Sequence, residues 1–286
     1  MDGSHTHKKY TLLPQSPNYY KNLEQGTDEW KQARKDFVLT GSELGSLLNI
    51  NSYNVSKKNL FQYKKTNTEK QYSDYQINTI FKWGNTNEPI AAGIFETWYK
   101  KNVSPSHSVK ATGSYPFTTS KSGYYVAASP DRLVLDNVGQ IISVVEIKCP
   151  WKKELYWNGI PEFLKITRAQ HGILPVNVNK EIVNLRLPND YFVQIQMQMA
   201  ATKTTMGYFV GWAPNEFIII EVQFSSSLWY NFIEPEIEQF AHSLVDSSSD
   251  AKIQSLIEQR EFRSQLTQMI TLIQDESNKL LYYKTL

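Results

Sequence analysis

Hydrophobic residues recur with a helical period in some segments of this chain and with a strand period in others. Residues 1–25 are polar and contain two prolines, so we expect an irregular lead-in there. Residues 27–37 place apolar side chains at helical spacing, with Thr27 or Asp28 as the cap. A second helix is expected to begin near residues 40–42. Lys- and Asn-rich sequence follows as far as about residue 76.

A longer helix is predicted over residues 87–101, because apolar residues form a stripe along it. Asn87 can cap this helix, and Pro89 suits its first turn. On this interpretation the helix begins at Asn87, and Glu88 lies at its N-terminus.

Three strand-like runs come next, the last two joined by a Gly-containing turn, and a capped helix and a β-hairpin follow them. From about residue 227 the chain is expected to be helical. The order helix, three strands, helix, strand predicts an α/β layer architecture rather than a helix bundle or a β-sandwich. The strands, the helix and the two arms of the hairpin are expected at 123–129, 132–136, 141–149, 189–203, 207–214 and 217–224.

Composition is that of an ordinary globular protein, with 41% hydrophobic and 20% charged residues in a chain of 286. A formal net charge of +2 does not by itself indicate nucleic-acid binding. The single cysteine, Cys149, excludes an intrachain disulfide, a multi-cysteine zinc site and a four-cysteine iron–sulfur cluster. No apolar segment approaches the roughly 20 residues needed to span a bilayer. We therefore expect a soluble, intracellular protein with no membrane partner.

The third predicted strand carries two charges in an apolar run, "VVEIKCPW" at residues 144–151. Side chains alternate along a strand, so Glu146 and Lys148 point to the same face. If the preceding turn is an even loop centred between Val138 and Gly139, Asp131 lies opposite Glu146, with β-carbons about 4.5–5.5 Å apart. A bulge at Gly139 would instead slip the pairing by one residue.

Two carboxylates this close repel each other unless a cation lies between them. Mg²⁺ suits such a site, because it takes oxygen ligands and one or two carboxylates together with phosphate oxygens. Lys148 could then stabilise negative charge on a reacting phosphate. The alternative is a surface pair without function, as we expect for the second Glu-x-Lys at residues 29–31. Asp131 at hairpin distance, and Glu88 at a helix start, favour the catalytic interpretation.

Three motifs in this order, "SPD" at 129–131, "VVEIKCPW" at 144–151 and "YFVQIQMQM" at 191–199, resemble the PD-(D/E)XK nuclease superfamily. Within it, the chain is similar to the phage lambda exonuclease type of viral recombination nuclease, over about residues 26–214. "EIKCP" following "SPD" is a specific pattern, whereas the Gln-rich helix alone is not.

The resemblance implies a restriction-endonuclease-like core, a mixed central sheet flanked by helices. We expect a single nuclease domain over residues 1–286. Its parts would be the lead-in at 1–25, the catalytic core at 26–225 and a C-terminal helical extension at 226–286.

The resemblance also implies a metal site. Asp131 and Glu146 would ligate Mg²⁺, with a contribution from the backbone carbonyl of Ile147. Lys148 would be the catalytic lysine. Glu88, in "WGNTNEPIA", would be the helix acid that completes the site, and its alternative role is to complement the helix dipole. Mn²⁺ is expected to substitute for Mg²⁺, and two ions are expected in the site.

Gln194 matches the family's helix glutamine, which orients the attacking water. Gln196 stays open as an alternative, because both amides lie in the same "VQIQ", and so does a polar helix face without a catalytic role.

The segment "GTDEWKQARKDFVLTGS" at 26–42 looks like the family's segment that holds a DNA terminal phosphate. It implies phosphate contacts from Arg34 and Ser42, with Ser129 as a third, and an ordinary surface arginine is the alternative for Arg34. The stretch from Arg34 to Ser42 is one residue longer than the family pattern. The chain also has Arg132 where the family commonly has Gly after "SPD", and this arginine could add a phosphate contact.

The function implied is a Mg²⁺-dependent 5′ to 3′ exonuclease on the ends of linear double-stranded DNA, in viral or phage-like recombination or genome processing. Relatives form homotrimers and can work with a single-strand annealing protein. The alternatives are an endonuclease of the same superfamily, a DNA-binding protein without catalysis on a nuclease scaffold, and an α/β protein with no DNA role. Tryptophans 83, 151 and 157 could stack on bases at a frayed end, or belong to the core.

Overall fold

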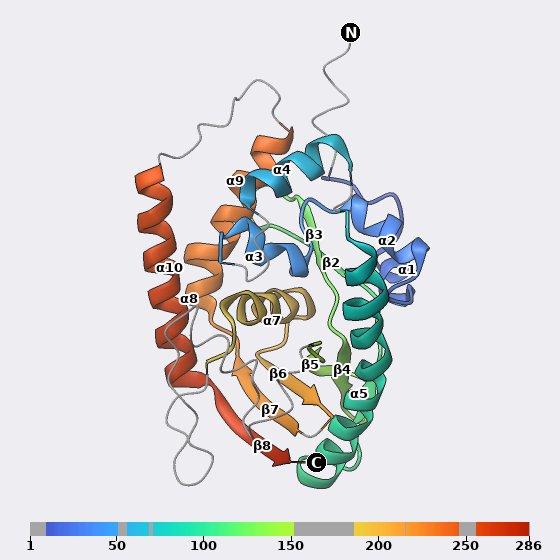
Figure 1. Cartoon of the computed structure of the whole chain (residues 1–286). Coiled ribbons are helices and arrows are strands. Elements are labelled where there is room, and N and C mark those ends of the chain that lie inside the picture. The colour runs from blue at the N-terminus through green and yellow to red at the C-terminus, as the bar shows by residue number, and fades with distance from the viewer. Residues whose placement is uncertain are drawn as a thin grey trace.

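A six-stranded mixed sheet forms the centre of the protein (Figure 1). The computed structural model describes residues 10–50, 56–68, 71–151, 186–214, 216–245 and 256–285. The strand order is β1-β4-β5-β6-β7-β8, in which β5 and β6 run parallel and the other neighbours antiparallel. The predicted class, a mixed sheet flanked by helices, is confirmed. The strands are β1 (Ser108–Lys110), β4 (Arg132–Leu135), β5 (Ile141–Lys148), β6 (Met206–Ala213), β7 (Glu216–Gln223) and β8 (Lys279–Thr285).

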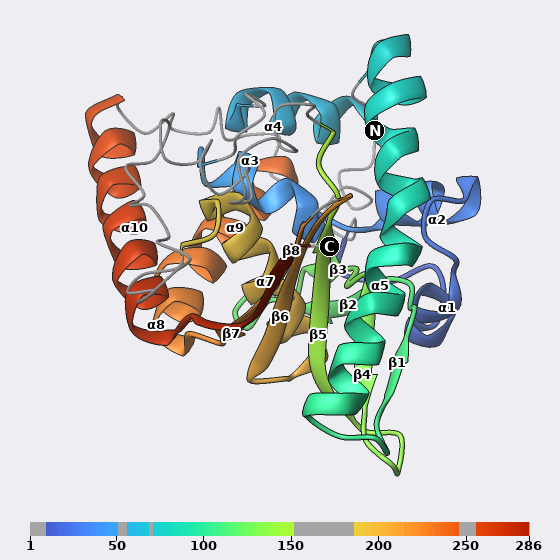
Figure 2. The same ribbon diagram turned by 60° about the horizontal axis from the view of Figure 1, so that its bottom comes forward.

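Two helices cover opposite faces of this sheet (Figure 2). Helix α7 (Asn189–Thr202) packs on the face to which Val144 of β5 points. Helix α5 (Lys82–Asn102) packs on the face of Val145 and Ile147. The alternation predicted for this strand is therefore present, and each face of β5 meets a different helix.

Gly207 at the start of β6 lets α7 lie close to the sheet. A β-carbon built there would be 2.9 Å from Cγ2 of Ile195 and 3.0 Å from Cγ2 of Val144, both closer than ordinary contact. Only a residue without a side chain fits, so this glycine helps to set the depth at which the polar side chains of α7 meet β5.

Helix α5 begins five residues earlier than predicted, at Lys82, and it continues a π-helical turn, η3 (Gln76–Phe81). Asn87 does not cap it, because its side-chain amide donates to the carbonyl of Trp83 at 2.8 Å. The early turns are held by Trp83, whose ring packs on Trp151 at 4.8 Å and on Trp212 at 6.2 Å. The placement of Glu88 at a helix N-terminus is therefore wrong, and so is its alternative role at the helix dipole.

The hairpin between β4 and β5 is built differently from the prediction. Its turn centres on Val138, since the N–H of Asp136 donates to the carbonyl of Gln140 at 3.0 Å, and Gly139 has φ +85°. The even loop is therefore wrong. A register shift between Val134 and Leu135 then adds one residue on β5, and Arg132 pairs with Val145. The odd loop and the register shift each change the pairing by one residue in opposite directions, so the strand ends farthest from the turn pair as predicted.

The N-terminal part contains more regular structure than predicted. Helix α1 (Pro17–Asn22) lies inside the expected irregular lead-in, capped by Ser16, and its Tyr20 is fully buried. A helix also occupies part of the Lys- and Asn-rich stretch. Thr27, one of the two expected caps, caps the first predicted helical segment, and the second segment begins after Thr40, within the expected range. The remaining elements here are α2 (Asp28–Ala33), η1 (Arg34–Asp36), η2 (Gly41–Glu43), α3 (Leu44–Leu47) and α4 (Lys57–Thr66).

A separate two-stranded sheet, β2 (Tyr115–Thr118) with β3 (Tyr125–Ala128), lies beside the N-terminal helices. The first predicted strand thus exists but does not join the central sheet. An isolated bridge between Thr40 and Ala127 connects it to the turn before η2. This bridge brings the segment after α2 next to the chain that leads to residue 131.

The C-terminal part is not entirely helical. After α8 (Ser226–Leu228), η5 (Trp229–Ile233), α9 (Glu234–Val245) and α10 (Leu256–Ser277), strand β8 pairs antiparallel with β7 and extends the central sheet. The predicted C-terminal helical extension is therefore present, but it ends in a strand that was not predicted. The segment "KLLYYKT" contains two leucines and two tyrosines, and it pairs with the outer edge of β7.

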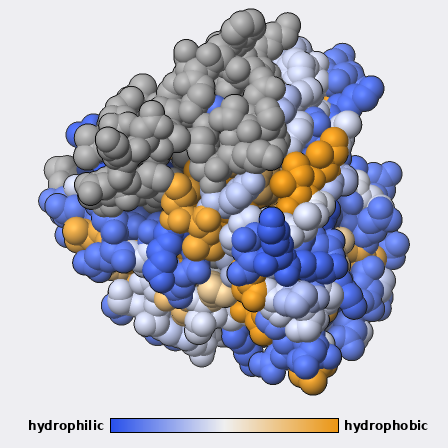
Figure 3. Space-filling model, turned by 90° about the horizontal axis from the view of Figure 1, so that it is seen from below, coloured by the Kyte–Doolittle hydropathy of each residue, from blue (hydrophilic) through white to orange (hydrophobic). Residues whose placement is uncertain are grey.

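The surface seen in Figure 3 is mostly hydrophilic, with hydrophobic residues in separate patches. Exposed apolar side chains include Ile77 and Ile90, at 48% and 49% exposure. Among the residues that the structure describes, no helix has the length and hydrophobicity to cross a membrane.

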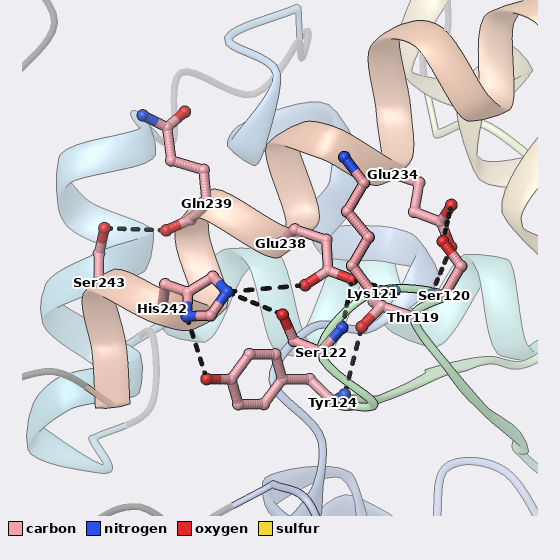
Figure 4. Close-up of polar contacts among 10 residues, drawn as sticks. All are labelled: Thr119, Ser120, Lys121, Ser122, Tyr124, Glu234, Glu238, Gln239, His242 and Ser243. Carbon is pink, nitrogen blue, oxygen red and sulfur yellow. Dashed lines mark hydrogen bonds and ion pairs between the residues drawn. The ribbon is translucent and has the colours of Figure 1, made fainter.

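The turn between β2 and β3 is held by acidic side chains of α9 (Figure 4). Glu238 accepts the backbone N–H groups of Lys121 and Ser122, both at 3.0 Å. Glu234 accepts the N–H of Ser120 at 2.9 Å and its hydroxyl at 2.8 Å. Burial raises the pKa of Glu238, but the hydrogen bonds from Ser122 and its neighbours outweigh it, so the pKa of Glu238 lies below its usual value.

We predict that Glu238→Ala lowers the free energy of unfolding by about 2 kcal/mol at pH 7, because two N–H groups lose a charged acceptor. A carboxyl with a lowered folded-state pKa stabilises the fold above its unfolded pKa, about 4.3, and this contribution is lost as the pH falls through the folded value. The difference between wild type and variant should therefore shrink below about pH 4. Urea denaturation at pH 7 and at lower pH measures it.

Gln239 gives the matched control, because it is the next residue of α9 and is exposed. Gln239→Ala should change the free energy of unfolding by less than about 0.5 kcal/mol at either pH. An equal loss in both variants would mean that the turn is not held by the Glu238 carboxylate.

Candidate active site

A fully buried carboxylate, that of Glu146 on β5, forms the centre of the candidate site. Its Oε1 accepts hydrogen bonds from Nζ of Lys148 and from Nε2 of Gln194, the latter at 2.7 Å. Its Oε2 accepts from Nε2 of Gln198 at 2.5 Å. Both oxygens are thus bound, by a charged neighbour on the same strand and by two amides of α7.

Asp131 lies beside this carboxylate at the entry to β4. The pairing of Arg132 with Val145 continues to place Asp131 opposite Glu146, as predicted. The N–H of Asp131 donates to the carbonyl of Val145 at 3.1 Å, and its Oδ2 accepts the N–H of Ile147 at 2.6 Å. Asp131 is therefore held against β5 by its backbone and by its side chain.

The electrostatic environment of Asp131 opposes its ionisation. Burial is the first cause that raises the pKa of this carboxyl well above its usual value, followed by the negative charges of Glu146 and then Glu88. Lys148 and the N–H of Ile147 lower the pKa only in part. A further positive charge beside Asp131 and Glu146 would favour the ionised form.

Lys148 ends β5, with about a quarter of its side chain exposed. Besides its contact with Glu146, its Nζ lies 5.1 Å from the centre of the Tyr191 ring, a cation–π distance. The ammonium group is thus held between the buried carboxylate and an aromatic side chain of α7.

Glu88 reaches the site region from α5, on the other face of the sheet. Its Oε1 accepts a hydrogen bond from Nη1 of Arg132 at 2.8 Å. Within the described ranges, no three His, Cys, Asp or Glu side chains lie close enough together to hold a metal ion. The metal role of Glu88 and the phosphate role of Arg132 stay predictions, and in this structure the two side chains bind each other.

The two glutamines left open by the sequence point in different directions. Gln194 contacts Glu146, whereas Gln196 donates to the carbonyl of Gln223 and accepts the N–H of Ser225, both at 2.8 Å. Gln196 therefore holds the end of β7 and is not at the site. Gln198 was not predicted as a site residue, although it follows Gln194 by four positions and so shares its helix face.

The predicted phosphate-binding residues Arg34 and Ser42 lie together. Nη2 of Arg34 donates to the hydroxyls of Ser42 at 2.8 Å and of Thr40 at 2.7 Å, and its guanidinium lies over the ring of Trp30 at 4.5 Å. The extra residue in this segment has not separated them. Thr40 was not among the phosphate-binding residues predicted from the sequence.

This cluster is next to the carboxylate site. A β-carbon built at Gly41 would be 3.7 Å from Cγ of Gln194 and 3.6 Å from Cβ of Ala128. Ser129, the third predicted phosphate residue, bonds through its hydroxyl to that of Ser114 at 2.8 Å, and its carbonyl accepts from Gln198 at 3.3 Å. Its position links the "SPD" segment to α7, and its phosphate role stays a prediction.

The donor set fits a hard divalent cation. Asp131 and Glu146 offer carboxylate oxygens of adjacent strands, and Mg²⁺ needs only one or two carboxylates when phosphate oxygens and water complete its shell. Burial and like charge at Asp131 are what such a cation would relieve. Asp131 and Glu146 would hold the ion. The predicted contribution of the Ile147 carbonyl stays a prediction.

Comparison with known proteins assigns a family to this arrangement. Residues 29–205, more than half of the 286, match the YqaJ-like viral recombinase domain. The chain belongs to this family. The recombinase domain contains all the predicted site residues, from Arg34 to Gln194, and the expected kinship with viral recombination nucleases is confirmed.

Solved structures similar to this recombinase domain are distant. The alkaline exonuclease LHK-Exo of Laribacter hongkongensis is 20% identical, with a TM-score of 0.49, and the comparison covers 85% of this chain and 100% of that one. Its complex with dAMP gives 19% and the same TM-score. A phage-related exonuclease from Haemophilus somnus 129PT is 9% identical, with a TM-score of 0.42, covering 81% of this chain and 96% of that one. No curated protein matches the chain.

Proposed function

We propose that the chain is a divalent-cation-dependent exonuclease that hydrolyses linear double-stranded DNA in the 5′ to 3′ direction during recombination. The observation that carries this proposal is the buried Glu146 carboxylate, with Asp131 and Lys148 beside it. Membership of a viral recombinase family supports the biological setting. A surface ion pair without function would not need two glutamines and a second carboxylate around it.

The residues of the site have separate roles in this proposal. When bound by Asp131 and Glu146, Mg²⁺ or Mn²⁺ would neutralise a phosphate oxygen and lower the pKa of a water molecule. Gln194 and Gln198 keep the Glu146 carboxylate in one orientation. Lys148 places a positive charge where negative charge grows on the phosphate during attack.

Arg34, Ser42 and Thr40 supply the end recognition in this proposal. Their guanidinium and hydroxyl groups can bind a terminal phosphate, and Arg34 suits it because its planar fork bonds two oxygens. The cluster lies beside Gln194, so a bound DNA end would put a nearby phosphodiester at Glu146. Phosphate contacts carry no sequence information, so hydrolysis should be largely independent of sequence.

Lys148→Ala is expected to reduce hydrolysis of linear 5′-phosphorylated duplex by at least about 100-fold, because a charge that stabilises the transition state is lost. The assay follows release of nucleotides from an end-labelled duplex with Mg²⁺ or Mn²⁺, with and without chelator. Covalently closed circular DNA should stay intact, and its cleavage would indicate an endonuclease.

Lys31→Ala is the matched control, since Lys31 belongs to the other Glu-x-Lys of the chain. Its Nζ pairs with Asp28 at 3.0 Å on the exposed surface, so full activity is expected. Activity retained by a folded Lys148→Ala protein would overturn the proposed role. DNA binding without cleavage by the wild type would favour a non-catalytic DNA-binding protein.

Arg34→Ala is expected to reduce the preference for 5′-phosphate over 5′-hydroxyl ends by about tenfold, because a charge-assisted hydrogen bond is worth roughly 1.5–3 kcal/mol. Rates on duplexes that differ only in this group measure the preference. Arg263→Ala serves as the control, because Arg263 is exposed on α10, far from α2 in Figure 1. A preference unchanged in Arg34→Ala would remove this residue from the phosphate site.

A further inference from the structure

Arg132 binds the carboxylate of Glu88 and the backbone of Asp131. Its Nη1 donates to Oε1 of Glu88 at 2.8 Å and to the backbone carbonyl of Asp131 at 2.5 Å. Only 16% of its side chain is exposed, and 33% of that of Glu88. This ion pair joins a largely buried arginine of a strand to a half-buried glutamate of a helix, 44 residues apart in the sequence.

The pair lies on the α5 side of the sheet. Arg132 is the partner of Val145, which faces α5, whereas Glu146 belongs to the face of Val144 and α7. Glu88 therefore has its counter-ion on its own face. The absence of a three-carboxylate cluster among the described residues follows from this division.

The charges of the region are close to balance without a second added cation. Lys148 binds Glu146, Arg132 binds Glu88, and Asp131 is the carboxyl left without a cationic partner of its own in these contacts. A second divalent ion bound at Oε1 of Glu88 would compete with the guanidinium of Arg132, and breaking one side of a buried pair is costly.

We propose that the guanidinium of Arg132 takes the place of a second divalent cation, so that the site holds one ion, bound by Asp131 and Glu146. Arg132 is thus a positioning residue that keeps Glu88 out of the cation's coordination shell. The inference rests on the proposed function, and it replaces the expectation of two ions and of Glu88 as a ligand.

The test is calorimetric titration of the full chain with Mn²⁺ in the absence of DNA, so that the readout is stoichiometry and affinity and not activity. Wild type should bind one ion per chain. Arg132→Ala should bind a second ion, or bind Mn²⁺ about tenfold more tightly, because Glu88 is released. Arg132→Lys keeps the positive charge and should stay at one ion.

Glu88→Gln completes a double-mutant cycle. In the wild-type background it should leave Mn²⁺ affinity within about twofold, and combined with Arg132→Ala it should remove the gain. Circular dichroism and thermal unfolding establish that each variant is folded. If Arg132→Ala does not fold, Glu88→Gln alone still tests the inference. If Glu88 were a ligand of the ion, this variant would bind Mn²⁺ more weakly than the wild type.

Two ions per wild-type chain, or about tenfold weaker binding in Glu88→Gln, would overturn the inference. So would an Arg132→Ala protein with unchanged Mn²⁺ binding. If that variant instead binds 5′-phosphorylated duplex more weakly in chelator, Arg132 contacts phosphate. If the wild type binds no Mn²⁺, and the Asp131→Asn variant hydrolyses DNA at the wild-type rate, the proposed function itself is overturned.

Discussion

A carboxylate buried in a sheet must be compensated, and the compensation of Glu146 determines how the surrounding elements meet. Removing an unpaired charge from water costs several kcal/mol, so a buried carboxylate persists only with hydrogen bonds and a counter-charge. Gln194 and Gln198 of α7 supply the hydrogen bonds, and Lys148 the charge. Because Gly207 lets α7 lie against the sheet, these amides reach the strand. The same contacts that make burial tolerable also hold the carboxylate in one orientation, which the proposed cation site requires.

The alternation of β5 separates two kinds of chemistry. On the α7 face the strand presents a carboxylate and an ammonium group next to the Arg34 cluster, where DNA phosphates would bind. On the α5 face it presents apolar side chains, and Arg132 and Glu88 neutralise each other there. Asp131 lies where the hairpin opens, with its side chain on the backbone of Ile147. A site for one cation follows from this partition in our account, and α5 acts mainly as support.

The local part of this arrangement could be predicted from the sequence. Strand alternation placed Glu146 with Lys148, and helical spacing placed Gln194 away from the apolar side of α7. The start of the second helical segment was expected near residues 40–42, where η2 begins. The pairing of Asp131 with Glu146 was predicted from an even hairpin loop, but the loop is odd. The pairing is still present, because the register shift between Val134 and Leu135 compensates for the difference of one residue. Periodicity fixes faces well, but it does not count the residues in a turn.

What could not be predicted depends on contacts between distant segments. Glu88 was placed at a helix start because Asn87 and Pro89 are typical of one, yet packing of Trp83 on Trp151 and Trp212 extends the helix past them. The partner of Arg132 lies 44 residues away, and β8 pairs with β7 although the two strands are far apart in the sequence. Gln198 could have been predicted from the sequence, since it shares a helix face with Gln194. Only the structure shows that it donates to Oε2 of Glu146.

The most direct test of this account is anomalous diffraction from crystals of the full chain grown with Mn²⁺. We predict a peak within ligand distance of carboxylate oxygens of both Asp131 and Glu146. A protein that binds Mn²⁺ elsewhere, with the Glu146 carboxylate still enclosed by Gln194, Gln198 and Lys148, would show that its burial serves the fold and not a cation, and would contradict the central claim.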